Sequence, residues 1–129
     1  MYLAGHFLEG EIMQYYPIVF NCLALTTNTF YVVLPVKARI LGALWVANGD
    51  PGVNNTVEIL PDGGSDIITG IISATPGAVV KGTVTATLAN AIQVIDPATT
   101  ALKIVLDTTA ACVVSMNLNL DVFAKKTAT

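Results

Sequence analysis

The residues that could support catalysis are few and scattered in this chain of 129 residues. His6 is the only histidine, so neither a metal site built on several imidazoles nor a Ser-His-Asp triad can be assembled without it. We interpret it as a packing or hydrogen-bonding residue. Glu9 and Glu11 are close in sequence, but a glycosidase pair must flank a cleft, and their segment predicts none. We therefore expect no catalytic pair and no enzyme activity.

Oxygen-bearing side chains gather in two neighbouring turns, where they could in principle bind calcium. They are Asp50, Asn54, Asn55, Asp62 and Asp66. Their spacing lacks the regular D-x-[DN]-x-[DN]-G loop that makes a calcium site specific. Asp and Asn are also the residues that reverse a chain through local hydrogen bonds. We interpret them as turn residues and expect neither a metal nor a cofactor.

The two cysteines, Cys22 and Cys112, stand alone, without a CxxC motif. Both lie in apolar, strand-like runs, which favours buried free thiols. A single disulfide is the alternative, and it requires the first and last strands to pair.

The composition excludes several classes of protein. The formal net charge is −3, whereas a nucleic-acid binder needs a basic stripe to neutralise phosphates. No segment reaches the roughly 18 apolar residues of a membrane-spanning helix. The apolar residues 17–25 follow two glutamates rather than a basic region, so we expect neither export nor membrane insertion. Charged residues make up only 12%, against about 25% in an average soluble domain, which predicts a surface partly covered by other subunits.

The elements that would position any site are predicted to be strands. In residues 114–122, Val, Met and Leu alternate with Ser, Asn and Asp without a break, which indicates one buried and one solvated face. Turn sequences rich in Gly, Pro, Asn and Asp separate further apolar runs. The predicted strands cover residues 18–25, 29–36, 38–47, 56–60, 66–73, 79–88, 102–107 and 111–124, and residues 92–95 could add a short extra one.

About eight strands with no intervening helix predict an all-β fold, an antiparallel two-sheet β-sandwich of the jelly-roll type. Residues 17–129 would form this domain. Residues 1–16 are aromatic and acidic, and we expect them to form an N-terminal arm. The strand at residues 38–47 is apolar on both faces, which predicts a central strand covered on both sides. Its two predicted faces are Ile40, Leu44 and Val46 against Leu41, Ala43 and Trp45.

Two passages resemble a known class of proteins. They are TFYVVLPVKARILGALWVAN (residues 29–48) and ALKIVLDTTAACVVSMNLNLDVF (residues 101–123), with PGAVVKGTVTATLAN (residues 76–90) between them. Their order is similar to that in the capsid decoration (cement) and head-fibre β-sandwich proteins of tailed bacteriophages, over roughly residues 28–124.

This resemblance implies a structural virion protein that binds the outer surface of the phage head and stabilises the shell by bridging capsid subunits. The implied partners are the major capsid protein and further copies of the chain, most often as a homotrimer. The implied location is the capsid exterior, after assembly in the host cytoplasm. An aromatic arm suits this role, because it adds contact area when it docks. The expected interface residues are Tyr2, Phe7, Leu8, Ile12, Tyr15, Tyr16, Tyr31 and Trp45.

The alternative function is a carbohydrate-binding β-sandwich module or a fibre-type host-attachment protein. Trp45 and the four tyrosines could then form a platform that stacks on sugars. Solvent accessibility of Trp45 discriminates between the two hypotheses, because a sugar platform must be exposed.

Overall fold

The computed structural model describes residues 11–24, 27–53, 55–85, 87, 93–110 and 112–125. For residues 11–24, 27–28 and 123–125 it describes the backbone only. These parts of the chain form ten strands and no helix. Consequently, none of them forms a helix long and apolar enough to cross a membrane.

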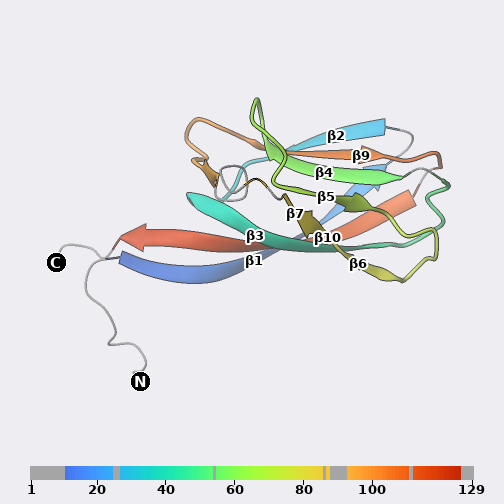
Figure 1. Ribbon diagram of the computed structural model, residues 1–129, viewed down its shortest axis with the longest axis horizontal. Coiled ribbons are helices and arrows are strands. Elements are labelled where there is room, and N and C mark those ends of the chain that lie inside the picture. The colour runs from blue at the N-terminus through green and yellow to red at the C-terminus, as the bar shows by residue number, and fades with distance from the viewer. Residues whose placement is uncertain are drawn as a thin grey trace, which may run out of the picture.

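The strands form two antiparallel sheets that pack face to face (Figure 1). The first sheet has the order β1 (Glu11–Ala24), β10 (Cys112–Lys125), β3 (Ala38–Ala47) and β6 (Val79–Lys81), and β8 (Val94–Ile95) also pairs with β3. The second sheet has the order β2 (Thr27–Val32), β9 (Leu102–Asp107), β4 (Thr56–Pro61), β5 (Ile68–Ile71) and β7 (Thr83–Val84).

This order confirms the expected β-sandwich and is that of a jelly roll. The first strand lies beside the last in one sheet, and β2 lies beside β9 in the other. The chain therefore changes sheet at almost every connection, as two Greek keys require. The short β8 confirms the extra strand considered for residues 92–95. The predicted strand at residues 79–88 is instead divided into β6 and β7, which belong to different sheets.

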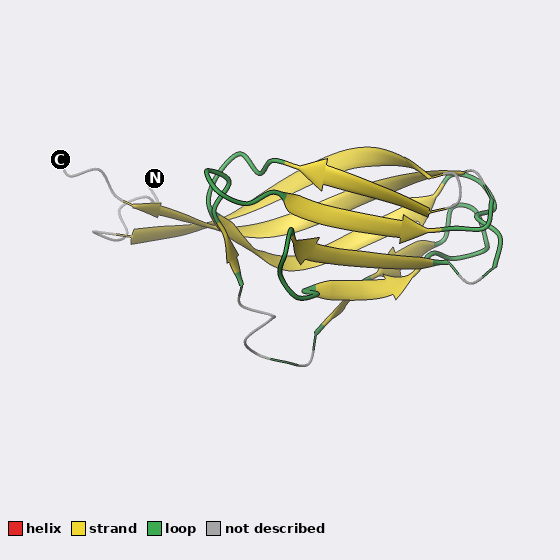
Figure 2. Cartoon of the chain, turned by 90° about the horizontal axis from the view of Figure 1, so that it is seen from above, coloured by secondary structure: helices red, strands yellow, loops and turns green. Residues whose placement is uncertain are grey.

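The first strand begins at Glu11 and not near Pro17, so residues 11–16 pair with the last strand in the first sheet. Its pairing with β10 runs unbroken from Glu11 opposite Lys125 to Ala24 opposite Cys112. Pro17 is tolerated because β1 is an edge strand, whose free side needs no backbone donor. Beyond Val122, where β3 begins, the two strands continue as a two-stranded ribbon (Figure 2).

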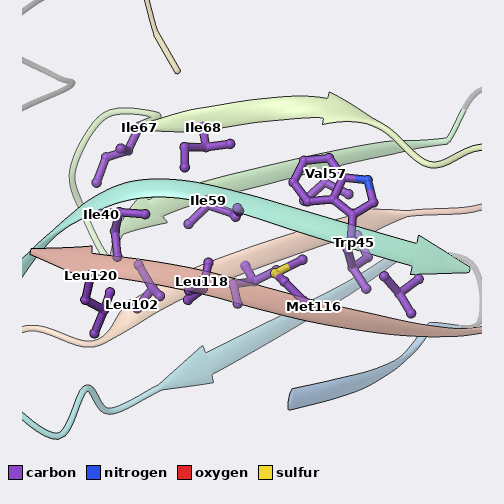
Figure 3. Packing of buried hydrophobic residues seen from close by; sticks show 14 of the residues in the cluster. Ile40, Trp45, Val57, Ile59, Ile67, Ile68, Leu102, Met116, Leu118 and Leu120 are labelled. Atoms are coloured by element: carbon purple, nitrogen blue, oxygen red, sulfur yellow. The ribbon is translucent and has the colours of Figure 1, made fainter. Parts of the chain in front are cut away.

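The core lies between the sheets (Figure 3). As the alternating pattern predicts, β10 buries Val114, Met116, Leu118, Leu120 and Val122. Opposite them, β9 buries Leu102, Ile104 and Leu106, and β4 buries Val57 and Ile59. Each of these strands contributes alternate side chains, so one face of each sheet is dry.

The solvated face predicted for β10 has one exception, Asp121, which is only 3% exposed. Arg39 lies opposite it on β3, and its Nη2 forms an ion pair with Asp121 Oδ2. The sequence pattern missed this burial because Arg39 is distant in the chain. A carboxylate is buried at low cost only when such a partner is adjacent.

The faces predicted for β3 are wrong in its second half. Asn119 of β10 lies opposite Gly42 and Leu120 lies opposite Ile40, so Leu41 is an extra residue that forms a bulge in β3. The buried positions therefore change from Ala38 and Ile40 to Ala43, Trp45 and Ala47. An extra residue at a bulge reverses the alternation that follows it. Leu41 and Leu44 consequently point outward and are 39% and 38% exposed, so the described residues cover the outer face of this strand only in part.

Trp45 closes the side of the sandwich where the chain crosses between sheets, and Figure 3 shows its ring reaching toward β4 and β5. Gly82 connects β6 in one sheet with β7 in the other and is itself buried. A Cβ atom at Gly82 would lie 2.8 Å from the Trp45 ring and would collide with Ile68. At Gly70 on β5, a Cβ atom would lie 2.7 Å from the same ring. Two glycines therefore make room for one indole.

We expect Gly82→Ala to lower the free energy of unfolding by about 1–3 kcal/mol, the usual cost of overpacking a core. Gly42→Ala is the matched control, because a Cβ atom there meets nothing within 4 Å. Urea melts of both variants measure the difference. Equal stability of the two variants would contradict the close packing of Gly82 against Trp45.

Candidate docking surface

Only two of the expected interface residues have side chains that the structure describes. Tyr31 lies on β2 and is 60% exposed, so it is available to a partner. Trp45 is 1% exposed, and its assignment to an interface is corrected: the ring belongs to the core. Sequence reasoning misplaced Trp45 because both faces of its strand are apolar. The remaining expected residues lie outside the described residues (Tyr2, Phe7, Leu8) or in β1, where the backbone alone is described (Ile12, Tyr15, Tyr16).

Nine large apolar side chains are exposed among the described residues. The outer face of the first sheet carries Leu41, Leu44 and Val79 on it or beside it. The edge formed by β2 carries Tyr31 and Val33. One end of the sandwich carries Val53 and Ile71. Val84 and Val94 lie on the short strands β7 and β8. Three separate regions of the surface therefore carry at least two such side chains each.

The first region is a shallow depression on the outer face of the first sheet. Leu44 of β3 lies opposite Asn117 of β10, and Val46 of β3 lies between Ser115 and Val79. These side chains surround a hollow of about 210 Å³. It lies over the segment of β3 that the bulge has turned outward.

The second region is a cleft of about 550 Å³ between the β3–β4 connection and the end of β5. Its lining includes Val53, Asn55, Thr56, Ile71, Ile72 and Ala74. Val53 is 67% exposed and Ile71 is 63% exposed, so both walls of the cleft present apolar side chains to solvent. The sequence analysis did not identify this cleft.

Hydrogen bonds fix the wall that carries Val53. The backbone N–H of Val53 donates to Thr109 Oγ1 at 2.8 Å, and Asn55 Nδ2 donates to the carbonyl of Gly52 at 2.7 Å. Asn55 Oδ1 accepts from the Thr109 N–H at 3.2 Å, so both the nitrogen and the oxygen of this buried amide form hydrogen bonds. Gly52 has a φ of 91°, a conformation that favours glycine, and a Cβ atom there would collide with Thr109 Oγ1.

The opposite wall is fixed from inside the core. Trp45 Nε1 donates to the backbone carbonyl of Ile71 at 2.8 Å. Ile71 lies on β5 opposite Thr56, and both side chains are exposed on the outer face of the sheet. The buried indole therefore supports the surface cleft through one hydrogen bond.

Acidic residues in the turns have structural roles. Asp50 Oδ1 accepts from the Gly52 N–H at 2.8 Å, and Asp96 Oδ1 accepts from the Ala98 N–H at 3.0 Å, as expected of Asp residues that stabilise turns. Among the residues that the structure describes, no three His, Cys, Asp or Glu side chains are grouped so that they could hold a metal ion.

Cys112 has a free, buried thiol at the start of β10. The first and last strands do pair, but Cys112 lies opposite Ala24, and Cys22 lies opposite Val114. Burial raises the pKa of the Cys112 thiol, and the negative charge of Asp50 raises this pKa further.

A raised pKa in the folded state makes the thiol a pH-dependent contributor to stability. Its contribution is complete below the unfolded pKa of about 8.5 and is lost as the pH rises through the folded value. We therefore expect the stability difference between wild type and Cys112→Ala to shrink from pH 7 to pH 10. Urea melts at both values measure it, and a constant difference would contradict burial of the thiol.

Comparison with known proteins yields a distant likeness among solved structures. Neither a protein-family model nor a curated protein sequence matches the chain. A chain of the cyanophage Pam1 capsid asymmetric unit matches with a TM-score of 0.46 and 18% sequence identity, over 95% of this chain and 92% of that one. A likeness this distant does not carry a function from one protein to the other.

Proposed function

We propose that this chain is a structural protein of a virion, a decoration or cement protein that binds the outside of a phage head. The observation that carries the proposal is the surface: the described residues of this jelly roll expose nine large apolar side chains, while charged residues make up only 12% of the chain. Such regions mark interaction sites in soluble proteins. The sequence resemblance to decoration and head-fibre proteins over roughly residues 28–124 supports the same conclusion.

The arrangement of the candidate contacts suits a protein that bridges subunits. The cleft follows β3, which ends at Ala47, whereas β1 begins at Glu11, beyond the other end of β3. The nine steps from Ala38 to Ala47 span about 30 Å in an extended strand. Glu11 therefore lies at the end of the sandwich opposite to the cleft (Figure 1). Contacts at both ends would connect two neighbouring capsid proteins.

Within this proposal the protein acts as a homotrimer on the capsid exterior, after assembly in the host cytoplasm, and it catalyses no reaction. Its partners are the major capsid protein and other copies of itself. A standard interface buries about 800 Å² on each partner. The exposed faces around Leu44 and Tyr31 offer apolar contacts between copies, and the N-terminal residues would add contacts to the capsid.

The carbohydrate-binding alternative loses its main support, because Trp45 is buried and cannot stack on a sugar. Of the aromatic side chains that the structure describes, Tyr31 is the one that is exposed. A single ring at a strand edge does not form a platform.

The proposal is tested by mixing the purified chain with undecorated heads of the phage that encodes it. We expect saturable co-sedimentation with the heads and a higher temperature of head disruption. Sedimentation velocity of the free chain tests the trimer separately. Absence of the chain from pelleted heads at micromolar concentration would overturn the decoration function, and a monomer both in solution and on heads would overturn the trimer.

A further inference from the structure

We propose that the cleft between Val53 and Ile71 binds a protein segment that carries a bulky apolar side chain and, about 10 Å away, a lysine or arginine. The identity of the partner, a capsid subunit, rests on the proposed function. The chemistry of the segment follows from the cleft itself, from its two apolar walls and from the charges beside it.

The apolar part of the site is preformed. Val53 is held by the Thr109 side chain, and Ile71 is held by the Trp45 indole, so neither wall has to become ordered when a ligand binds. Preorganised walls reduce the entropic cost of binding. Their side chains are about two-thirds exposed, which is too open to enclose a free small molecule. One side chain projecting from a larger partner fits better, because the partner covers the open side.

The charged part lies in the same row of the second sheet. Thr56 of β4 lies opposite both Ile71 of β5 and Asp107 of β9, so these three side chains share the outer face. Neighbouring strands are about 4.8 Å apart, which places Asp107 two strand spacings, or about 10 Å, from Ile71. Asp107 is exposed. A segment lying across the strands would therefore contact the apolar side chain of Ile71 and, two strands away, the carboxylate of Asp107.

The described residues at this end of the sandwich carry negative charge. Residues 48–53, 55–56, 71–79 and 107–110 include Asp50 and Asp107 but neither lysine nor arginine. The charge complement of this surface is basic, which is why the segment needs Lys or Arg rather than Asp or Glu. In an extended segment, side chains two residues apart point to the same side and lie about 6.6 Å apart, and the long Lys or Arg side chain covers the remaining distance.

The test selects ligands from a random 12-residue peptide library displayed on phage, with the full chain as target. We expect enrichment of peptides with Leu, Ile, Phe or Trp two positions from Lys or Arg. Fluorescence anisotropy with a labelled enriched peptide then compares variants. Ile71→Asp should weaken binding at least about tenfold, and Asp107→Asn should weaken it several-fold and reduce its dependence on salt.

Val33→Asp is the matched control, because Val33 is 72% exposed and follows the end of β2 that lies away from Asp107, and it should leave affinity within about twofold. Enrichment of peptides without a basic residue, equal binding to Ile71→Asp and wild type, or a loss with Val33→Asp would each overturn the site. Head binding separates the two proposals. Wild type and Ile71→Asp binding heads equally would overturn the cleft alone, whereas wild type failing to bind heads would overturn the decoration function alone.

Discussion

Replacing Trp45 by alanine should lower the free energy of unfolding by about 3–5 kcal/mol, the usual cost of deleting a large buried aromatic side chain. The indole is 1% exposed and fits between Gly70 and Gly82, whose backbones cannot move inward to fill the space without disrupting both sheets. The substitution also leaves the Ile71 carbonyl without its donor. Because small domains are stable by only about 5–15 kcal/mol, this loss is large.

Two further variants separate the causes. Trp45→Phe keeps much of the ring but removes the N–H, so its cost, about 1–3 kcal/mol, measures mainly the hydrogen bond to Ile71. Leu44 directly precedes Trp45 and points to the outer face, where it is exposed. Leu44→Ala should therefore lower the free energy of unfolding less than Trp45→Ala does. Chemical denaturation followed by circular dichroism measures all three. A greater cost for Leu44→Ala than for Trp45→Ala would contradict the placement of Trp45 in the core.

The variant Trp45→Phe also connects the core with the cleft. If the indole holds the Ile71 wall, peptide binding in the cleft should weaken even where the fold remains intact. The position of one buried donor would then influence a surface contact.

The parts of the fold that the sequence predicted are those that depend on local pattern. The strict alternation in residues 114–122 placed Leu118 in the core correctly, and the Gly and Asn turns separated most strands where the structure separates them. The errors arise where residues distant in the sequence determine the strand register or the burial of a side chain. The bulge at Leu41 of β3 depends on the register with β10, and the burial of Asp121 depends on Arg39 across the sheet. Neither is visible in the local sequence.

The cleft was missed for a related reason. Val53 lies in the polar turn NGDPGVNN, where a single apolar residue does not indicate a binding site. Ile71 lies in an apolar run that predicts burial. Only the register, with Ile71 opposite Thr56, shows that its side chain points outward. The one available signal was an apolar residue isolated within a turn of Gly, Asn and Asp. Exposed apolar residues in rigid turns therefore merit examination as candidate contacts.

We expect an N-terminal truncation to lower the stability of the fold once it removes residues from Glu11 onward, because β1 begins at Glu11 and not near Pro17. Removing residues 1–10 leaves every pair between β1 and β10 intact, so we expect an unchanged melting temperature. Removing residues 1–16 deletes the pairs from Glu11 opposite Lys125 to Tyr16 opposite Leu120. At about 0.5–1.5 kcal/mol for each backbone hydrogen bond, this loss should cost at least about 3 kcal/mol.

The same truncations test the docking role of the N-terminal residues. The chain lacking residues 1–10 should fold but bind undecorated heads less tightly, because that segment contributes Tyr2, Phe7 and Leu8, apolar side chains of the kind that anchor interfaces. Thermal melts and co-sedimentation with heads measure the two effects independently. Undiminished head binding would restrict attachment to the sandwich, with the cleft as the main contact. An unchanged melt after removal of residues 1–16 would instead show that pairing before Pro17 contributes nothing to the fold.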